Sequence, residues 1–253
     1  MVSPTPPPTR STKRLLLSRG IAALLLASAC ASAPKQPAAP IQVPPEEQHG
    51  FTGVVLASGK ALPNLATIKG EIVRYHDSGL WSETIDRVAA QARARLDELI
   101  VGARRPALVL DIDDTALSTY SLQRRLFFGF MEEEWDRWMA DQSPPANQGV
   151  LELYRYALRR GVAVFFVTGR REFARKATER QLRTAGYDTW AGLELKPTDY
   201  KEQSVVPYKA GARARIEAQG YDVLVNVGDQ WSDLDGGHAV ATFKLPNPIY
   251  VIP

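Results

Sequence analysis

Acidic side chains gather directly after one apolar run of the sequence. The run is Ala107–Leu110, and Asp111, Asp113 and Asp114 follow it within four positions. A short apolar run of this kind predicts a buried parallel strand, and open α/β sheets bind their ligands beyond the carboxyl ends of such strands. Carboxylates so close together repel one another unless a cation lies between them. Two of them can also divide catalytic work, since one can attack while the other protonates the leaving group.

Two further apolar runs, Val162–Val167 and Val223–Val227, also end in polar residues. The residues of interest after them are Thr168, Gly169, Arg170, Asp229 and Asp233. Because parallel strands of one sheet end at a shared edge, we expect these side chains to meet Asp111 and Asp113. The four carboxylates predict an all-oxygen metal site, since the chain has one cysteine and three histidines. Mg²⁺ suits such a site best because it binds through carboxylates, water and substrate phosphate.

Helical patterns alternate with these runs along the chain. The expected strands are residues 107–112, 162–167, 189–195, 223–227 and 241–245. The expected helices are residues 62–101, in which Ser82 and Glu83 mark a start, then 150–160, 172–185 and 209–219. Strands that alternate with helices predict an α/β fold with a doubly wound, Rossmann-like parallel sheet in three α/β/α layers.

The segment between the first strand and the next helix has a composition of its own. It lacks a strand pattern, carries aromatic residues at roughly helical spacing from Phe127 to Trp138, and ends near Ser143-Pro144-Pro145. This predicts a small helical cap at about residues 118–148, inserted after the first core strand. Its aromatic rings form either the core of the cap or a platform for a substrate, a role also open to Tyr120 and Trp231.

The first thirty residues differ from the rest of the chain. Residues 1–29 contain four basic side chains and no acidic one, and an apolar stretch precedes Cys30, the only cysteine. This pattern predicts a signal peptide, and residues 26–30 resemble the processing site of bacterial lipoproteins, in which the cysteine is lipidated. A secreted protein cleaved after Ala29 or Ala33 is the alternative. We expect residues 30–50, rich in Ala and Pro, to form a disordered tether before a folded domain at residues 51–253.

Four short motifs of the sequence follow one another in a familiar order. They are Asp111–Thr115, Thr168–Arg170, Lys209 at the start of a predicted helix, and Gly228–Asp233. In this order they resemble the motifs of the haloacid dehalogenase-like superfamily, and the phrases GDQWSDL and FKLPNPIY are similar to its acid phosphatase branch. That branch includes bacterial outer-membrane lipoprotein acid phosphatases and plant vegetative storage proteins. The resemblance covers about residues 50–253, and Asp114 departs from it because glutamate is usual there.

The resemblance implies a role for each motif residue. Asp111 would be the nucleophile that accepts the phosphoryl group, and Asp113 would protonate the leaving group and then activate water. The residues implied to bind the substrate's phosphoryl group are Thr168, Gly169, Arg170 and Lys209.

The resemblance also implies a metal site. Mg²⁺ would be held by Asp111, the backbone carbonyl of Asp113 and Asp229. Asp233 would be a further ligand or an anchor for a metal-bound water, although a carboxylate there also suits the start of a helix.

Plainer interpretations of single residues stay open. Asp111 and Asp113 alone would be an ordinary turn or helix-capping pair, and only the other motifs favour a site. Lys196 and Lys201 are rivals of Lys209.

The function predicted from the sequence is a Mg²⁺-dependent acid phosphatase that acts on small phosphomonoesters such as nucleoside monophosphates, sugar phosphates or aryl phosphates. We expect no nucleic-acid polymer as partner, because without residues 1–29 the chain has 27 basic against 28 acidic residues and a capped site excludes polymers. The expected location is the periplasm or outer membrane of a Gram-negative bacterium, with a membrane anchor if Cys30 is lipidated. The alternatives are a phosphotransferase and a non-catalytic storage or binding protein on the same fold.

Overall fold

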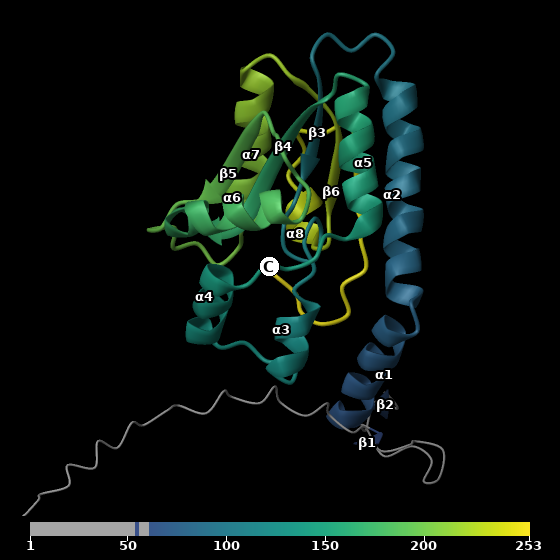
Figure 1. Cartoon of the computed structure of the whole chain (residues 1–253), viewed down its shortest axis with the longest axis vertical. Coiled ribbons are helices and arrows are strands. Elements are labelled where there is room, and N and C mark those ends of the chain that lie inside the picture. Colours follow the sequence, from purple (N-terminus) through teal and green to yellow (C-terminus); the bar gives the residue numbers. More distant parts are fainter. Residues whose placement is uncertain (1–53, 56–60) are drawn as a thin grey trace, which may run out of the picture. The chain divides into compact units, whose positions relative to one another are not determined.

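A five-stranded parallel sheet lies at the centre of the computed structural model, which describes Val54–Val55 and residues 61–253 (Figure 1). Its strand order is β5-β4-β3-β6-β7. The strands are β3 (Pro106–Leu110), β4 (Ala163–Arg171), β5 (Gly192–Lys196), β6 (Asp222–Gly228) and β7 (Ala241–Lys244). Because β3 pairs in parallel with both β4 and β6, the strand order reverses beside it, which makes its carboxyl end a ligand-binding position. The doubly wound α/β fold predicted from the sequence is confirmed.

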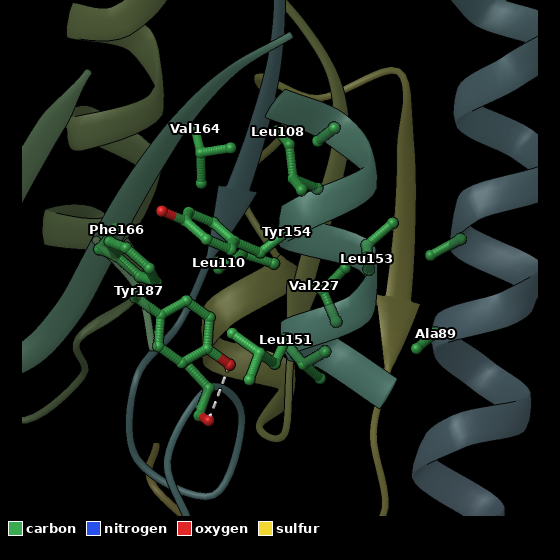
Figure 2. Packing of buried hydrophobic residues seen from close by; sticks show 14 of the residues in the cluster. Ala89, Leu108, Leu110, Leu151, Leu153, Tyr154, Val164, Phe166, Tyr187 and Val227 are labelled. Atoms are coloured by element: carbon green, nitrogen blue, oxygen red, sulfur yellow. Dashed lines mark hydrogen bonds between the residues drawn. The ribbon is translucent and has the colours of Figure 1, made fainter. Parts of the chain in front are cut away.

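Alternate residues of the central strand supply two separate cores. Leu108 and Leu110 belong to one apolar cluster, whereas Ala107 and Val109 belong to the other. This division follows from the two-residue period of a strand whose faces are both covered. Figure 2 shows the larger cluster, whose other members include Tyr154, Val164, Phe166 and Tyr187.

Helices cover both faces of the sheet. In Figure 1, α2 (Leu80–Leu99) and α5 (Gln148–Arg159) lie side by side on one face and α7 (Val206–Ala218) on the other. A β-carbon at Gly149 of α5 would lie 2.7 Å from the backbone of Asp86, so glycine permits the close approach of α2 and α5. The remaining elements of this part are the 3₁₀ turn η2 (Glu172–Ala174), α6 (Arg175–Thr184) and the short α8 (Trp231–Leu234).

Two short helices between β3 and α5 form the predicted cap. They are α3 (Tyr120–Arg125) and α4 (Glu132–Asp141), and Figure 1 shows both beyond the carboxyl end of β3. Leu122, Trp138 and Met139 are buried together with Ala174 of η2. Part of the aromatic cluster is therefore the core of the cap, as one of the two interpretations predicted.

Residues 62–101 are largely helical as expected, but the second helix does not start at the signal read at Ser82 and Glu83. The structure has two helices there, α1 (Leu65–Asp77) and α2, separated at Ser78 and Gly79. Gly79 lies in the left-handed region (φ 87°), which glycine enters without steric cost, and its carbonyl accepts the Glu83 N–H at 3.0 Å. Helix α2 therefore begins before Ser82, and the start signal read at Ser82 and Glu83 lies inside its first turn.

A pair of two-residue antiparallel strands, β1 (Val54–Val55) and β2 (Ala61–Leu62), was not predicted. Among the described helices, none combines the length and the apolar character that a membrane crossing requires. The predicted signal peptide at 1–29, Cys30 and the tether at 30–50 lie outside the described residues.

Candidate active site

Asp111 is the first residue after β3, and its position continues the strand. Its N–H donates to the Val227 carbonyl of β6 at 3.0 Å, and its side chain is buried. Asp229 follows β6 directly and Asp233 lies in α8. One carboxylate oxygen from each of these three buried aspartates lies within 4.8 Å of the others, so together they could hold a metal ion. The structure therefore brings the early and the late acidic motifs to one point.

Gly228 makes room for this cluster. A β-carbon at this position would lie 2.7 Å from Cγ of Asp233, closer than real β-carbons approach other atoms. Asp233 in turn accepts the Gln230 N–H at 2.8 Å, so it starts α8 as well as facing the cluster. The helix-start interpretation of Asp233 is thus confirmed, and its role at a metal ion stays a prediction.

Lys209 contacts two of these carboxylates. It is buried near the start of α7, which begins three residues earlier than predicted, at Val206. Its Nζ donates to Asp111 Oδ1 at 2.7 Å and also contacts Asp233. Of the rivals, Lys201 is exposed, whereas Lys196 lines the cavity described below and burial lowers its pKa.

The negative charge of the three clustered carboxylates exceeds the positive charge of Lys209. Burial raises the pKa of Asp111 well above its ordinary value, an effect that Lys209 opposes and that Asp233 and Asp229 increase. Burial, with Asp233 and then Asp114, raises the pKa of Asp229 to about 7. Burial alone would lower the pKa of Lys209, but the two aspartates it contacts raise it well above its ordinary value. One lysine charge does not balance three carboxylates, and a divalent cation would complete the balance.

Asp113 lies apart from the three-carboxylate cluster. Its side chain is 16% exposed at the cavity and forms an ion pair with Arg170, whose Nη2 is 2.7 Å from Asp113 Oδ1. The Arg170 side chain, only 1% exposed, donates its remaining hydrogen bonds to Thr178 and Gln181. Arg170 thus contacts the expected acid, and its expected contact with the substrate stays a prediction.

The other two substrate-binding candidates lie beside Arg170. Gly169 lines the cavity, and space for a further atom is open above it. Thr168 is buried, accepts the Arg170 N–H at 3.2 Å through its hydroxyl oxygen, and is not among the described residues that line the cavity. The phosphoryl contacts expected of Thr168 and Gly169 remain predictions.

A cavity of about 410 Å³ connects these groups. Its polar side includes the carboxylates together with Lys209, Arg170 and Lys196. Its apolar side consists of Phe128, Phe130 and Trp135 of the cap segment with Val251 and Ile252. Some cap rings therefore face the cavity while others form the cap core, and the role of the former as a platform for a substrate stays a prediction. Tyr120 instead stacks on His76, with ring centroids 3.4 Å apart.

Several residues that hold the site together were missed in the sequence. Asp229 accepts hydrogen bonds from Thr115 (3.1 Å), Gln230 (2.7 Å) and Asn247 (2.7 Å). These three donors fix the carboxylate without supplying a charge. Asn247 lies in the phrase FKLPNPIY, which was noticed as a family feature but was given no chemical role.

Asp114, which lies outside the expected catalytic pair, accepts three hydrogen bonds from other segments. It lies in the left-handed region (φ 54°), is buried, and accepts hydrogen bonds from the Thr119 N–H (2.8 Å) and hydroxyl (2.6 Å). The Tyr250 hydroxyl also donates to it, at 2.7 Å. Asp114 therefore joins the loop after β3 to the start of the cap and to the segment that follows β7.

Comparison with known proteins places the chain in a family. Residues 56–253 match the family model of the HAD superfamily, subfamily IIIB (Acid phosphatase). The chain belongs to this family. The resemblance seen in the sequence is thereby confirmed.

Relatives and solved structures agree with this assignment. The chain is 38% identical over 154 residues to the Stem 28 kDa glycoprotein of Glycine max, covering 58% of this chain and 61% of that protein. It is 36% identical over 173 residues to Acid phosphatase 1 of Solanum lycopersicum, covering 66% and 68%, and 32% identical over 149 residues to Vegetative storage protein 1 of Arabidopsis thaliana, covering 57% and 55%. The chain thus spans a little over half to about two thirds of these relatives.

The fold is also shared with a solved structure, the class C acid phosphatase from Bacillus anthracis. The TM-score is 0.61 at 19% sequence identity, over 74% of this chain and 85% of that one. A second structure of that protein, with tungstate bound, matches with a TM-score of 0.60 at 20% identity, over 73% and 86%.

The location predicted from the sequence is wrong. The curated relatives named above are plant acid phosphatases and storage or stem proteins, which point to a plant protein. They contradict the periplasm or outer membrane of a Gram-negative bacterium as its place.

Proposed function

We propose that the protein is a Mg²⁺-dependent acid phosphatase that hydrolyses small phosphomonoesters through an aspartyl-phosphate. One observation carries the proposal. Buried Asp111 ends the central strand at the cavity, where it contacts Lys209 and shares a metal-capable cluster with Asp229 and Asp233. The proposed nucleophile, a lysine and a possible metal site therefore lie together at this cavity, and the chain belongs to an acid phosphatase family.

The reaction divides into two displacements at phosphorus. In the first, a carboxylate oxygen of Asp111 attacks the phosphorus, the bond from phosphorus to the ester oxygen breaks, and the Asp113 carboxyl group gives its proton to the departing oxygen. In the second, water attacks the phosphorus while Asp113 takes its proton, and the bond to Asp111 breaks. Inorganic phosphate leaves, and both aspartates return to their first state.

Positive charge at this position serves both steps. Lys209 offsets the charge of Asp111 and of the transferring group. Asp111, Asp229 and the backbone carbonyl of Asp113 would hold Mg²⁺, with Asp233 as a further ligand or as the partner of a metal-bound water. When bound, Mg²⁺ would supply charge that stabilises the phosphoryl oxygens.

The cavity suits a small substrate. Its volume of about 410 Å³ and its apolar cap side match a nucleoside monophosphate, a sugar phosphate or an aryl phosphate. We assign the phosphoryl group to the carboxylate side, beside Thr168, Gly169 and Lys209. The tungstate bound to the Bacillus anthracis enzyme, a tetrahedral oxyanion like phosphate, supports an oxyanion site on this fold. We assign the catalytic domain to residues 51–253, with the cap at about 118–148.

A metal-removal experiment tests the proposal. After dialysis against EDTA, we expect the rates on p-nitrophenyl phosphate and nucleoside monophosphates to fall at least about 100-fold, because several kcal/mol of charge stabilisation is lost, and to return with Mg²⁺. Full activity after EDTA would reject the metal dependence. No phosphate release from any monoester with Mg²⁺ present would favour the storage or binding alternative, because two relatives are named vegetative storage proteins. A phosphorylated product with added glycerol or nucleoside would identify a phosphotransferase.

Magnesium binding should weaken as the pH falls. The pKa of Asp229 lies at about 7 in the metal-free protein, above its ordinary value, so the folded protein holds a proton there that the unfolded chain releases. Protonation of Asp229 therefore adds to the free energy of unfolding at acidic pH, and this stabilisation is lost as the pH rises through about 7. Mg²⁺ must displace the proton, so we expect its Kd to rise by up to about tenfold per pH unit below 7. Calorimetric titrations at three pH values between 6 and 8 measure this, and a constant Kd would contradict it.

A further inference from the structure

A buried chain of hydrogen bonds leads from Asp113 away from the cavity. Arg170 donates to Asp113 from Nε (2.9 Å to Oδ2) and from Nη2 (2.7 Å to Oδ1). Its third nitrogen, Nη1, donates to Oε1 of Gln181 at 2.7 Å and to the Thr178 hydroxyl at 3.2 Å. All three guanidinium nitrogens thus have partners, and the plane of the group is set by contacts on two sides.

Gln181 extends this chain to the cap. The residue is fully buried in α6, and its Nε2 donates to the backbone carbonyls of Met139 (2.9 Å) and Gln142 (3.0 Å). These carbonyls lie in the last turn of α4 and just after it, where a helix leaves carbonyl groups without internal partners. One amide side chain therefore connects Arg170, through its oxygen, with the end of the cap helix, through its nitrogen.

We propose that Gln181 is a positioning residue for the phosphatase reaction, which fixes Arg170, and through it the carboxyl group of Asp113, against the end of cap helix α4. This inference rests on the proposed role of Asp113 as the acid that protonates the leaving group. Without Gln181, Nη1 of Arg170 keeps only the longer contact to Thr178, and the guanidinium can turn. A proton donor has to lie within hydrogen-bond reach of the leaving oxygen, and a misplacement of about 1 Å can cost about 100-fold in rate.

Substrates that differ in their need for the acid test the proposal. The p-nitrophenolate ion leaves with little protonation, whereas the alkoxide of β-glycerophosphate needs a proton as it departs. For Gln181→Met we expect kcat/KM on β-glycerophosphate to fall about 10- to 100-fold, while kcat/KM on p-nitrophenyl phosphate falls less than about threefold. Asp113→Asn should show the same selectivity more strongly. An equal loss on both substrates, or no loss, would overturn the proposal, because a purely structural role does not distinguish leaving groups.

Arg180→Ala is the matched control. Exposed Arg180 also lies in α6 and contacts the end of α4, through the Ala140 carbonyl, but in the described part of the chain it forms no hydrogen bond or ion pair with Arg170 or Asp113. We expect this variant to leave the ratio of the two kcat/KM values unchanged. A shift in its ratio as large as that of Gln181→Met would show that cap attachment in general is responsible and would overturn the role of Gln181.

A second variant covers the case in which Gln181→Met does not fold, as judged by thermal unfolding. Gln181→Glu keeps an acceptor for Arg170 but replaces the donor to the two cap carbonyls, and it is judged by the same ratio. The proposed function is tested separately by the parent and Asp111→Asn. If the parent is inactive, or Asp111→Asn matches it, the proposed function fails and this inference falls with it. If both behave as expected and the ratio for the Gln181 variants stays constant, only this inference fails.

Discussion

Asp111→Asn is expected to reduce kcat on p-nitrophenyl phosphate by about 10⁴-fold or more, because an amide cannot form the aspartyl-phosphate and removal of a nucleophile costs losses of this size. The two side chains have nearly the same shape, so we expect asparagine to fit the buried position after β3. The folded structure should therefore survive. Steady-state rates with saturating Mg²⁺ measure the effect, and the melting temperature reports on the fold.

The matched control is Asp136→Asn in cap helix α4. Asp136 is exposed and belongs neither to the carboxylate cluster nor to the residues that line the cavity, and the same substitution there removes the same charge. Its rate should equal that of the parent. If Asp111→Asn also hydrolysed the substrate at the parental rate, the covalent mechanism would be excluded. A storage protein would show no hydrolysis in any of the three proteins.

Lys209→Met should destabilise the metal-free protein by about 3–5 kcal/mol, since it leaves buried Asp111 and Asp233 without their cation. For a folded part of this size the loss corresponds to a fall of roughly 6–20 °C in Tm. Because Mg²⁺ would neutralise the same carboxylates, it should raise the Tm of the variant more than that of the parent. Hydrolysis should fall at least about 100-fold even with Mg²⁺, because the transferring phosphoryl group loses a positioned cation.

Lys201→Met provides the comparison for this variant. Lys201 is exposed and was a rival for the same role in the sequence, and its replacement should leave both Tm and rate near the parental values. Thermal unfolding with EDTA and with Mg²⁺, alongside kinetics on p-nitrophenyl phosphate, separates the two lysines. A Lys209→Met protein with unchanged stability and rate would refute the assignment of Lys209.

The amino-acid sequence by itself determined the sheet and the residues at its edge. The apolar runs before Asp111, Thr168 and Asp229 became β3, β4 and β6, because a strand buried on both faces needs apolar side chains at nearly every position. A parallel sheet then brings the ends of its strands to one edge, so the meeting of Asp111 with Asp229 followed from the order of elements. The cap between β3 and α5 was likewise visible in composition.

Local sequence was less informative where a helix could continue or stop. Residues 62–101 have one helical pattern, yet the chain turns at Gly79 because glycine alone enters the left-handed region there without strain. Lys209 was expected to be the first residue of its helix, but the helix begins three residues earlier, at Val206. In both cases the spacing of the apolar residues predicted a helix but did not locate where the helix begins.

Only the tertiary structure decided which polar groups hold the site. Arg170 meets Asp113, 57 positions away, and Gln181 joins Arg170 to the cap; Asn247 and Tyr250 meet Asp229 and Asp114 at separations of 18 and 136 residues. Such pairs have no periodic signal, because a single hydrogen bond depends on the orientation of two side chains that the backbone brings together after folding. Hydrophobic burial involves many residues and therefore produces a pattern in the sequence. Each of these hydrogen bonds instead involves a single pair of side chains, which only the packed structure brings together.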